Sequence, residues 1–299
     1  MDVSGRSPME ASDGVEVVVA LGSELAEGPI WDERTGRLVW VDILGRRIHA
    51  TDPGTGDTST IQTPLPVGAV AARTRGGFVA ALEDGFWIVG DGPARRITAV
   101  PEARPGLRFN DGKCDPAGRF WAGTMAYDVT AGAGALYRLD ADGRATLVVP
   151  GVTLSNGLAW SGDGRTMFYI DSRTHRIDAF TFDPATGALA DRRTIVEIPA
   201  ADGTPDGLTI DEDDGLWVAL AHGGTVRRFV DGREDRVIRL PVSLVTSLTF
   251  GGPDRDILFI TSAWEHMTDA ERAREPLAGA VFRVRPGVRG RPADVYRGV

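Results

Sequence analysis

The sequence predicts an all-β protein, a six-bladed β-propeller with four antiparallel strands in each blade. The first observation is a short apolar strand that follows a Gly- or Asp-containing turn and recurs six times. Its copies begin at Gly36, Gly76, Gly118, Gly164, Gly215 and Asp256, so successive starts are 40, 42, 46, 51 and 41 residues apart. The second observation is that sustained helical periodicity is nearly absent. Strands rich in Val, Ile, Trp and Phe at this period are typical of propeller blades.

The first repeat shows how one blade is divided into strands. From the inner strand outward, we expect its four strands at residues 28–32, 38–43, 47–51 and 58–63. Residues 52–56 form the turn between the third and fourth strands, and residues 183–187 repeat that turn in the fourth unit. Pro presets φ in such a turn, and Gly supplies a positive φ.

The repeats also predict the domain organisation. They fill residues from about 22 to 299, so we expect residues 15–299 to form a single propeller domain, preceded by a disordered polar tail at 1–14. That tail lacks the apolar core of a signal peptide. The last blade needs an outer strand, for which residues 15–20 are the preferred candidate and 294–296 the alternative. Thr268 and Glu271 have capping-box spacing and predict a helical excursion between the second and third strands of blade six.

Composition and charge narrow the classes of function. Of the 299 residues, 42% are hydrophobic, and the net charge is −9 with Arg scattered among acids, which argues against a nucleic-acid partner. No apolar run approaches the ~20 residues that cross a membrane. Cys114 is the only cysteine, which excludes an intrachain disulfide, and we expect it to be a small buried hydrophobe. We therefore expect a cytoplasmic protein, monomeric or weakly homo-oligomeric, whose partner is a small molecule.

A short motif heads several predicted inner strands: an acidic or amide residue, then Gly, then an apolar run. It occurs at Glu27, Asn156 and Asp206, and one residue out of step at Asn110-Asp111. Inner strands line the central channel of a propeller, so their first residues should form a ring at one mouth. Blade by blade, that ring position holds Glu27, Val67, Asn110 or Asp111, Asn156, Asp206, and Thr246 or Ser247.

Two carboxylates with at least one amide oxygen make this ring a candidate site for one divalent metal cation. Oxygen ligands favour Ca²⁺, Mg²⁺ or Mn²⁺, and the absence of His from the ring argues against a structural Zn²⁺ site, although Zn²⁺ stays among the candidate ions. The alternative interpretation is that Asn-Gly and Asp-Gly are simply good turn dipeptides. It explains any one of them alone. Three at equivalent positions, together with Glu27, which no turn requires, favour the metal.

The loops after the second strands should return to the same mouth and form pocket walls. They begin near Asp42, Glu83, Met125, Asp171, His222 and Trp264. For Asp42 and Asp171, capping of the loop and contact with substrate are both open, and His222 faces either the pocket or solvent. Tyr127 and Trp264 are candidates for an apolar floor. Arg108 binds a polar substrate or forms a surface ion pair. The sequence contains no Gly-x-Ser-x-Gly elbow, phosphate loop, dinucleotide fingerprint or His-Glu-x-x-His motif.

Several stretches together resemble one known family, the senescence marker protein/gluconolactonase family, which includes regucalcin and the luciferin-regenerating enzymes. They are 26–31 (AEGPIW), 108–113 (RFNDGK), 115–125 (DPAGRFWAGTM), 154–160 (LSNGLAW) and 205–211 (PDGLTID), with shorter ones between and after them. The resemblance implies a six-bladed propeller with a divalent metal held by Glu27, Asn156 and Asp206. It also implies that Arg108 and Asn110 bind substrate, which favours Asn110 over Asp111 for the ring, and that Asp206 is the general acid/base.

The expected function is therefore a metal-dependent, gluconolactonase-like hydrolase that opens a sugar-acid lactone, an enzyme of carbohydrate metabolism. As a metal-bound carboxylate, Asp206 should keep a low pKa. Three departures bear on the identity of the sugar. Tyr127 and Asp128 stand where some lactonases of the family place a Glu, His222 replaces a common Trp, and no Pro precedes Thr246. The alternatives are an organophosphate or aryl-ester hydrolase on the same ring, and a non-enzymatic calcium-binding propeller.

Overall fold

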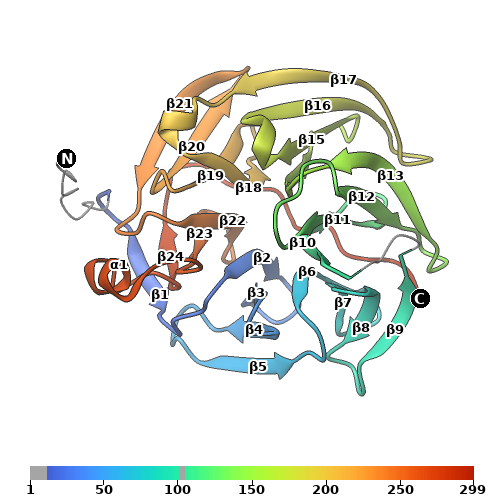
Figure 1. Cartoon of the computed structure of the whole chain (residues 1–299), viewed down its shortest axis with the longest axis horizontal. Coiled ribbons are helices and arrows are strands. Elements are labelled where there is room, and N and C mark those ends of the chain that lie inside the picture. The colour runs from blue at the N-terminus through green and yellow to red at the C-terminus, as the bar shows by residue number, and fades with distance from the viewer. Residues whose placement is uncertain (1–11, 101–104) are drawn as a thin grey trace.

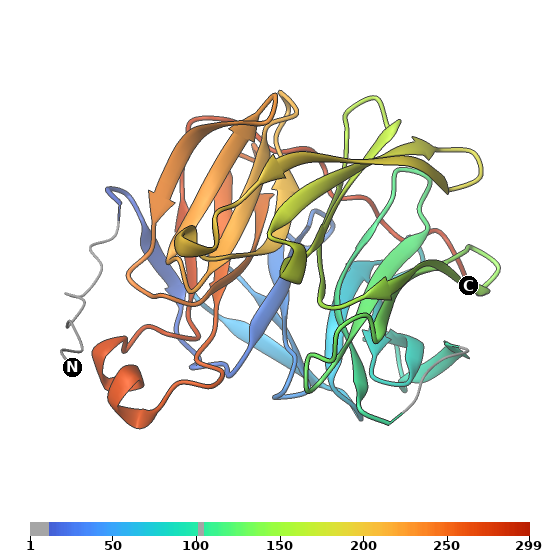
Figure 2. The same ribbon diagram turned by 45° about the horizontal axis from the view of Figure 1, so that its top comes forward.

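The computed structural model describes residues 12–100 and 105–299, which form six four-stranded antiparallel sheets around a central axis (Figures 1 and 2). From the axis outward, blade one is β2 (Ala26–Asp32), β3 (Arg37–Asp42), β4 (Arg47–Thr51) and β5 (Thr58–Gln62). Blade two is β6 (Val67–Ala72), β7 (Phe78–Leu82), β8 (Gly85–Val89) and β9 (Arg95–Ala99). Blade three is β10 (Leu107–Cys114), β11 (Phe120–Ala126), β12 (Gly134–Leu139) and β13 (Ala145–Val152).

The other three blades repeat this plan, which confirms the predicted six-bladed propeller. Blade four is β14 (Ser155–Trp160), β15 (Thr166–Asp171), β16 (Arg176–Asp183) and β17 (Ala188–Glu197). Blade five is β18 (Thr204–Ile210), β19 (Leu216–Ala221), β20 (Thr225–Val230) and β21 (Arg233–Arg239). Blade six is β22 (Val245–Gly251), β23 (Ile257–Ser262), β24 (Val281–Val284) and, from the other end of the chain, β1 (Glu16–Val19).

The ring is closed by strand β1, as predicted for residues 15–20. Its residues Glu16 and Val17 pair antiparallel with Arg283 and Phe282 of β24. The alternative closing strand at 294–296 is not formed. Tyr296 instead makes a parallel bridge with Arg73, and the segment that leads to it crosses behind the inner strands (Figure 1). Of the predicted tail, residues 1–11 lie outside the described residues.

The predicted excursion of blade six contains the short helix α1 (Asp269–Arg274), which has the expected capping box. The Thr268 side chain accepts from the Glu271 amide at 3.3 Å, and the Glu271 carboxylate accepts from the Thr268 amide at 2.8 Å. Two 3₁₀ turns, Ser172–Thr174 and Ala200–Asp202, lie in the loops after β15 and β17. Within residues 12–100 and 105–299, no helix is long and apolar enough to cross a membrane.

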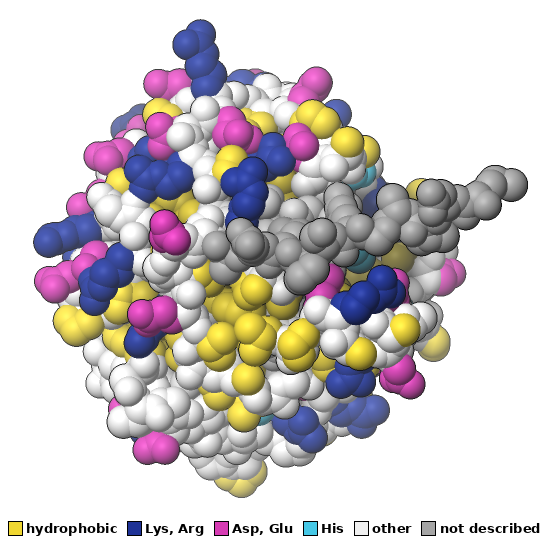
Figure 3. Space-filling view, turned by 90° about the vertical axis from the view of Figure 1, so that its left-hand side faces the viewer, with side chains coloured by type: hydrophobic (Ala, Val, Ile, Leu, Met, Phe, Trp, Pro, Cys, Tyr) yellow, Lys and Arg dark blue, Asp and Glu magenta, His cyan; other side chains and the backbone are white. Residues whose placement is uncertain are grey.

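The side of the molecule that carries β1 has a mixed surface of charged and apolar side chains (Figure 3). There, basic and acidic side chains are interspersed, without the basic stripe that a phosphate backbone requires (Figure 3). Strand β1 lies on this side, and Val17 is 42% exposed. This distribution agrees with the charge pattern read from the sequence.

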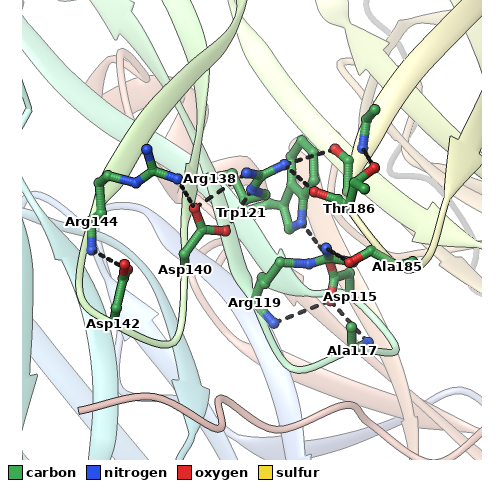
Figure 4. A network of polar contacts seen from close by, with 12 residues as sticks. Asp115, Ala117, Arg119, Trp121, Arg138, Asp140, Asp142, Arg144, Ala185 and Thr186 are labelled. Atoms are coloured by element: carbon green, nitrogen blue, oxygen red, sulfur yellow. Dashed lines mark hydrogen bonds and ion pairs between the residues drawn. The ribbon is translucent and has the colours of Figure 1, made fainter.

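Aspartates at the ends of inner strands fix the turns that lead to the second strands. Asp115 accepts through Oδ1 from the amides of Ala117 and Arg119. Through Oδ2 it accepts from Arg119 Nε at 2.6 Å and Trp121 Nε1 at 2.8 Å (Figure 4). Asp211 holds the corresponding turn of blade five, where Trp217 Nε1 donates to it at 2.8 Å. These carboxylates are inaccessible to solvent, so each turn is a rigid support for an inner strand.

Replacing Asp115 by Ala should therefore destabilise the fold by about 3–5 kcal/mol, because it removes the carboxylate paired with the mostly buried Arg119 and leaves Arg119 Nε and the Trp121 indole without their acceptor. The measurement is urea denaturation followed by tryptophan fluorescence. Asp142→Ala is the matched control, because Asp142 is exposed and, among the described residues, accepts only from the Arg144 amide. An equal, small loss in both variants would contradict the structural role of Asp115.

Candidate functional site

Each of the six inner strands departs from regular pairing with its neighbour near its start. Register shifts fall between Glu27 and Ile30, and between Ser155 and Leu158. Equivalent shifts occur at Val67–Ala69, Phe109–Gly112, Pro205–Leu208 and Val245–Leu248. A β-bulge of this kind re-aims side chains and is frequent beside active sites. It turns the residues at the start of each strand toward the axis.

In blades four and five, the Gly that follows the ring residue is required by the close approach of the neighbouring blade. A Cβ added at Gly157 would lie 2.8 Å from Asp206 O, and one at Gly207 would lie 2.6 Å from the Ser247 Cα. Both distances are too short for a real Cβ, so no other residue fits without moving backbone. In these two blades the acid-or-amide–Gly motif therefore combines a side chain aimed at the axis with a glycine that lets the next blade approach. At Gly28 an added Cβ would lie 3.7 Å from its nearest neighbour, and the glycine is favoured there by its φ of +49°.

The predicted site residues come together in one pocket of about 420 Å³ at this mouth. Its polar lining consists of Glu27, Arg108, Asn110, Asn156, Ser172, Arg173, Thr204, Asp206, His222, Thr246, Glu265 and His266. Asn110, rather than Asp111, contributes to the lining, in agreement with the choice made from the resemblance. Asp111 is buried and accepts from the Gly112 amide at 2.6 Å.

A chain of hydrogen bonds joins blades three and four across the pocket. Arg108 Nη1 donates to Asn110 Oδ1 at 2.5 Å, and Asn110 Nδ2 donates to Asn156 Oδ1 at 2.8 Å. Asn156 Nδ2 in turn donates to Ser172 Oγ at 2.8 Å. This chain fixes both amide groups, so that Asn156 presents its oxygen on the side of Asn110. On blade one, Glu27 Oε2 accepts from the Gly28 amide at 2.8 Å.

The surroundings of the ring carboxylates disfavour their charged form. Burial raises the pKa of Glu27 to about 8, and the charge of Asp111 adds to that shift. Burial, followed by the charges of Glu27 and Asp111, raises the pKa of Asp206 well above its ordinary value. Asp206 Oδ1 is buried and has no hydrogen-bond partner among the residues that the structure describes. Burying a charged or polar oxygen without a partner is costly, so these oxygens fit a cation as their missing partner.

The expectation that Asp206 keeps a low pKa applies to the metal-bound protein, and the metal-free structure gives the opposite direction. A bound cation would favour the ionised carboxylate and release its proton. Among residues 12–100 and 105–299, no three His, Cys, Asp or Glu side chains group together as a metal site. The predicted set includes only two such residues and takes its third oxygen from Asn156.

The chain is similar in sequence to known proteins over most of its length. Residues 25–264 match the family described as the SMP-30/Gluconolactonase/LRE-like region. The chain belongs to this family. Zebrafish (Danio rerio) regucalcin is 41% identical over 95% of this chain and 98% of its own length. YvrE of Bacillus subtilis, named as a candidate sugar lactone lactonase, is 38% identical over 86% of this chain and 90% of its own.

Solved structures of relatives have the same fold over nearly the whole chain. A structure of regucalcin from Agrobacterium tumefaciens, described as a calcium-binding protein, superposes with a TM-score of 0.90 at 29% identity. It covers 95% of this chain and 97% of the other. A luciferin-regenerating enzyme superposes with a TM-score of 0.88 at 32% identity, covering 95% and 99%. The family membership inferred from the sequence motifs is thus confirmed.

The structure resolves several alternatives left open for the loop residues. Asp42 accepts from the amides of Leu25 and Gly45, and Asp171 accepts from the amides of Thr153 and Leu154. Both are therefore loop caps, and neither is part of the pocket lining. By contrast, His222 and Tyr127 do line the pocket. Trp264 does not, because its indole Nε1 donates to Gly22 O at 2.9 Å.

Sequence reasoning missed three charged or titratable side chains of the pocket: Arg173, Glu265 and His266. All three lie in loops that follow second strands, β15 for Arg173 and β23 for the other two. The rule that those loops return to the pocket mouth pointed to the right segments. It could not select individual residues, because the loops lack the repeat that aligned the inner strands.

A second cavity of about 290 Å³ lies at the opposite ends of the inner strands, beneath residues 291–294. It shares no lining residue with the first pocket, and its walls include Cys114 and Lys113. Burial raises the pKa of Cys114, which agrees with the expected buried, un-ionised thiol. Lys113 Nζ donates to Leu208 O at 2.8 Å. The first pocket is the candidate functional site, because it brings Asp206 Oδ1, which has no hydrogen-bond partner within residues 12–100 and 105–299, together with Glu27 and the amide side chains of Asn110 and Asn156.

Replacing Glu27 by Gln should change how stability depends on pH in the metal-free protein. The raised pKa of Glu27 in the folded state means that its contribution to stability is present below pH 4.5 and is lost as pH rises toward 8. Gln cannot ionise, so the stability of E27Q relative to wild type should rise over that window by on the order of a few kcal/mol. Titrating groups that do not interact with Glu27 cancel in the difference, and Asp206, whose pKa the Glu27 charge raises, contributes to it. A pH-independent difference in urea denaturation would contradict the assigned burial of this charge.

Proposed function

We propose that this protein is a metal-dependent hydrolase that opens the lactone ring of a sugar acid. The observation that carries the proposal is the buried, partner-free Oδ1 of Asp206, which shares a pocket with Glu27, Asn156 and Arg108. A site of this kind combines unneutralised oxygen ligands for a cation with a guanidinium that can orient a polar substrate. Support also comes from YvrE, because its name refers to a sugar lactone lactonase.

Glu27, Asn156 and Asp206 would hold one divalent cation through their side-chain oxygens. When bound, such a cation supplies Lewis acidity that polarises the lactone carbonyl. Ca²⁺, Mg²⁺ and Mn²⁺ are the ions that such an oxygen set favours, and Zn²⁺ completes the set to be tested. Ca²⁺ is supported further by the description of the Agrobacterium relative as a calcium-binding protein.

Asp206 would move the proton in both halves of the reaction. Its carboxylate would accept a proton from the attacking water and later return it to the leaving alkoxide, and no hydrogen bond from residues 12–100 or 105–299 occupies its Oδ1. Arg108 and Asn110 would hold the substrate ring, and their mutual hydrogen bond fixes their positions before substrate arrives. The apolar lining from Leu25, Met125 and Leu154 would help to exclude bulk water.

The two alternative functions are an organophosphate or aryl-ester hydrolase and a non-enzymatic calcium-binding propeller. An organophosphate or aryl-ester hydrolase would require a pocket with little polar contact from Arg108, whereas Arg108 lines this pocket. A non-enzymatic calcium-binding propeller is favoured only by the description of the Agrobacterium relative as a calcium-binding protein. Turnover assays separate both functions from a lactonase.

Metal dependence is tested by an acid-release assay with gluconolactone, xylonolactone, galactonolactone and a phenyl ester. We expect chelation to abolish enzymatic hydrolysis, and restoration of Ca²⁺, Mg²⁺, Mn²⁺ or Zn²⁺ one at a time to restore it for lactones. Spontaneous hydrolysis is subtracted from each rate. Full activity after complete removal of metal would contradict the mechanism, and full metal occupancy without turnover of any substrate would favour the calcium-binding function.

Replacing Asp206 by Asn should lower kcat by about 10²–10⁴-fold at saturating metal, because the amide cannot accept and return the proton. Asp254→Asn is the control, since Asp254 is exposed at the opposite end of blade six. Circular dichroism and metal titration establish that each variant is folded and loaded. A folded, metal-loaded D206N with wild-type kcat would rule out the assigned role.

Replacing Glu27 by Gln should instead act on binding. Loss of one ligand charge should weaken metal affinity by at least about tenfold, since even outer partners of metal ligands are worth that much. At saturating metal, E27Q should recover much of the wild-type kcat, which distinguishes a binding residue from a proton-transferring one. Isothermal titration with Ca²⁺ and Mn²⁺ measures the affinity. An unchanged affinity would remove Glu27 from the ligand set.

A further inference from the structure

The candidate pocket contains one more carboxylate than the metal set uses, that of Glu265. It lies in the loop that follows β23 of blade six. Arg108 lies in β10 of blade three, across the ring from blade six. The Glu265 side chain is only 21% exposed. Neither the ring repeat nor the family motifs pointed to this residue, so its chemistry has to be derived from its surroundings.

The loop that carries Glu265 is held in place by contacts on both sides. The amides of Trp264 and Glu265 both donate to Glu24 O, at 3.1 and 3.0 Å. The Trp264 indole is covered by the Arg272 guanidinium of α1, which lies 3.9 Å from the ring centroid. The helical excursion of blade six, which lies on the face opposite the C-terminal segment (Figure 2), thus supports the turn that presents Glu265 to the pocket.

Arg108 enters the same pocket with hydrogen-bonding capacity left over. Its Nη1 donates to Phe109 O at 3.1 Å and to Asn110 Oδ1. Within the described part of the chain, its Nη2 donates to no acceptor, and its Nε is buried without a partner. A guanidinium has five N–H donors, so Arg108 is incompletely satisfied by the protein.

Glu265 has unused acceptor capacity, just as Arg108 has unused donors. Its recorded partner is His266, 3.5 Å away, and the side chain of that histidine is 90% exposed. Burial lowers the pKa of Arg108, and Glu265 is the strongest of the negative charges that oppose this shift. Across residues 12–100 and 105–299, however, the recorded hydrogen bonds and ion pairs include none between Arg108 and Glu265. The two charges therefore act on one another across the pocket without direct contact.

We propose that Arg108 and Glu265 together form a subsite for substrate hydroxyl groups, so that the substrate is a polyhydroxylated lactone. This inference rests on the proposed lactonase function. A hydroxyl donates one hydrogen bond and accepts others, so it can donate to the Glu265 carboxylate while it accepts from Arg108 Nη2. An aryl ester, a phosphotriester or an unsubstituted lactone offers acceptors alone and would leave the carboxylate facing another acceptor. Glu265 therefore selects among substrates without taking part in proton transfer.

The test compares glucono-δ-lactone with δ-valerolactone, which has the same ring and no hydroxyl groups. Glu265→Ala should lower kcat/KM for gluconolactone by about ten- to a hundredfold, mainly through KM, because it removes a hydrogen bond to a charged group. It should change kcat/KM for δ-valerolactone by less than about twofold. Glu265→Gln keeps an acceptor oxygen and should fall between wild type and Glu265→Ala. Assays are run at saturating metal, so that a change in metal affinity does not enter the comparison.

Asp269→Ala is the matched control, since Asp269 is an exposed acid of the same excursion and should leave both substrates unaffected. Equal losses on both lactones in Glu265→Ala would mean that the residue only supports the loop, and would overturn the inference while leaving the lactonase function in place. If wild-type protein hydrolyses neither lactone above the spontaneous rate, the proposed function itself fails. A loss of kcat/KM in Glu265→Ala for gluconolactone, without a matching loss for δ-valerolactone, supports the hydroxyl subsite.

Discussion

The close approach of six inner strands at one axis is the constraint on which the rest of this structure depends. Each strand carries a bulge near its start, which turns a side chain toward the axis. Neighbouring strands then come so near that Gly157 and Gly207 have no room for a Cβ. Sheet geometry alone thus delivers Glu27, Asn156 and Asp206 to one mouth of the propeller, although 179 residues separate the first from the last.

That geometry brings several acidic side chains close together at the axis. Glu27 and Asp111 are buried and Asp206 is partly buried, and burial raises the pKa of each. The nearby cation is Arg108 for Glu27 and Asp206, and Lys113 for Asp111. Natural folds normally pair buried charges, and departures are typical of functional sites. The remaining contacts of the site, such as the Arg108–Asn110–Asn156 chain, are fully formed. A preformed amide network beside carboxylates whose charged form is disfavoured supports the proposed cation site.

The repeat made the propeller, its closing strand and the ring position predictable, because strand period and Gly placement follow from local chemistry. The choice between Asn110 and Asp111 was different, since a bulge shifts register by one residue and only the family resemblance favoured Asn110. Strand bounds were predicted to within a residue or two, as in β2, which begins at Ala26 rather than at residue 28. Asp42 and Asp171 stayed open because loop capping depends on the conformation of the loop itself. Glu265 was missed for the same reason: it lies in an insertion that has no counterpart in other blades.

Anomalous diffraction from crystals of the wild-type protein soaked with Mn²⁺ tests the central claim most directly. The account predicts one strong Mn²⁺ peak at the pocket mouth, with side-chain oxygens of Glu27, Asn156 and Asp206 at about 2.0–2.4 Å. The peak should vanish from crystals of E27Q soaked at the same low concentration. A protein that binds no Mn²⁺ at this position, or that binds it only through other residues, would contradict the account.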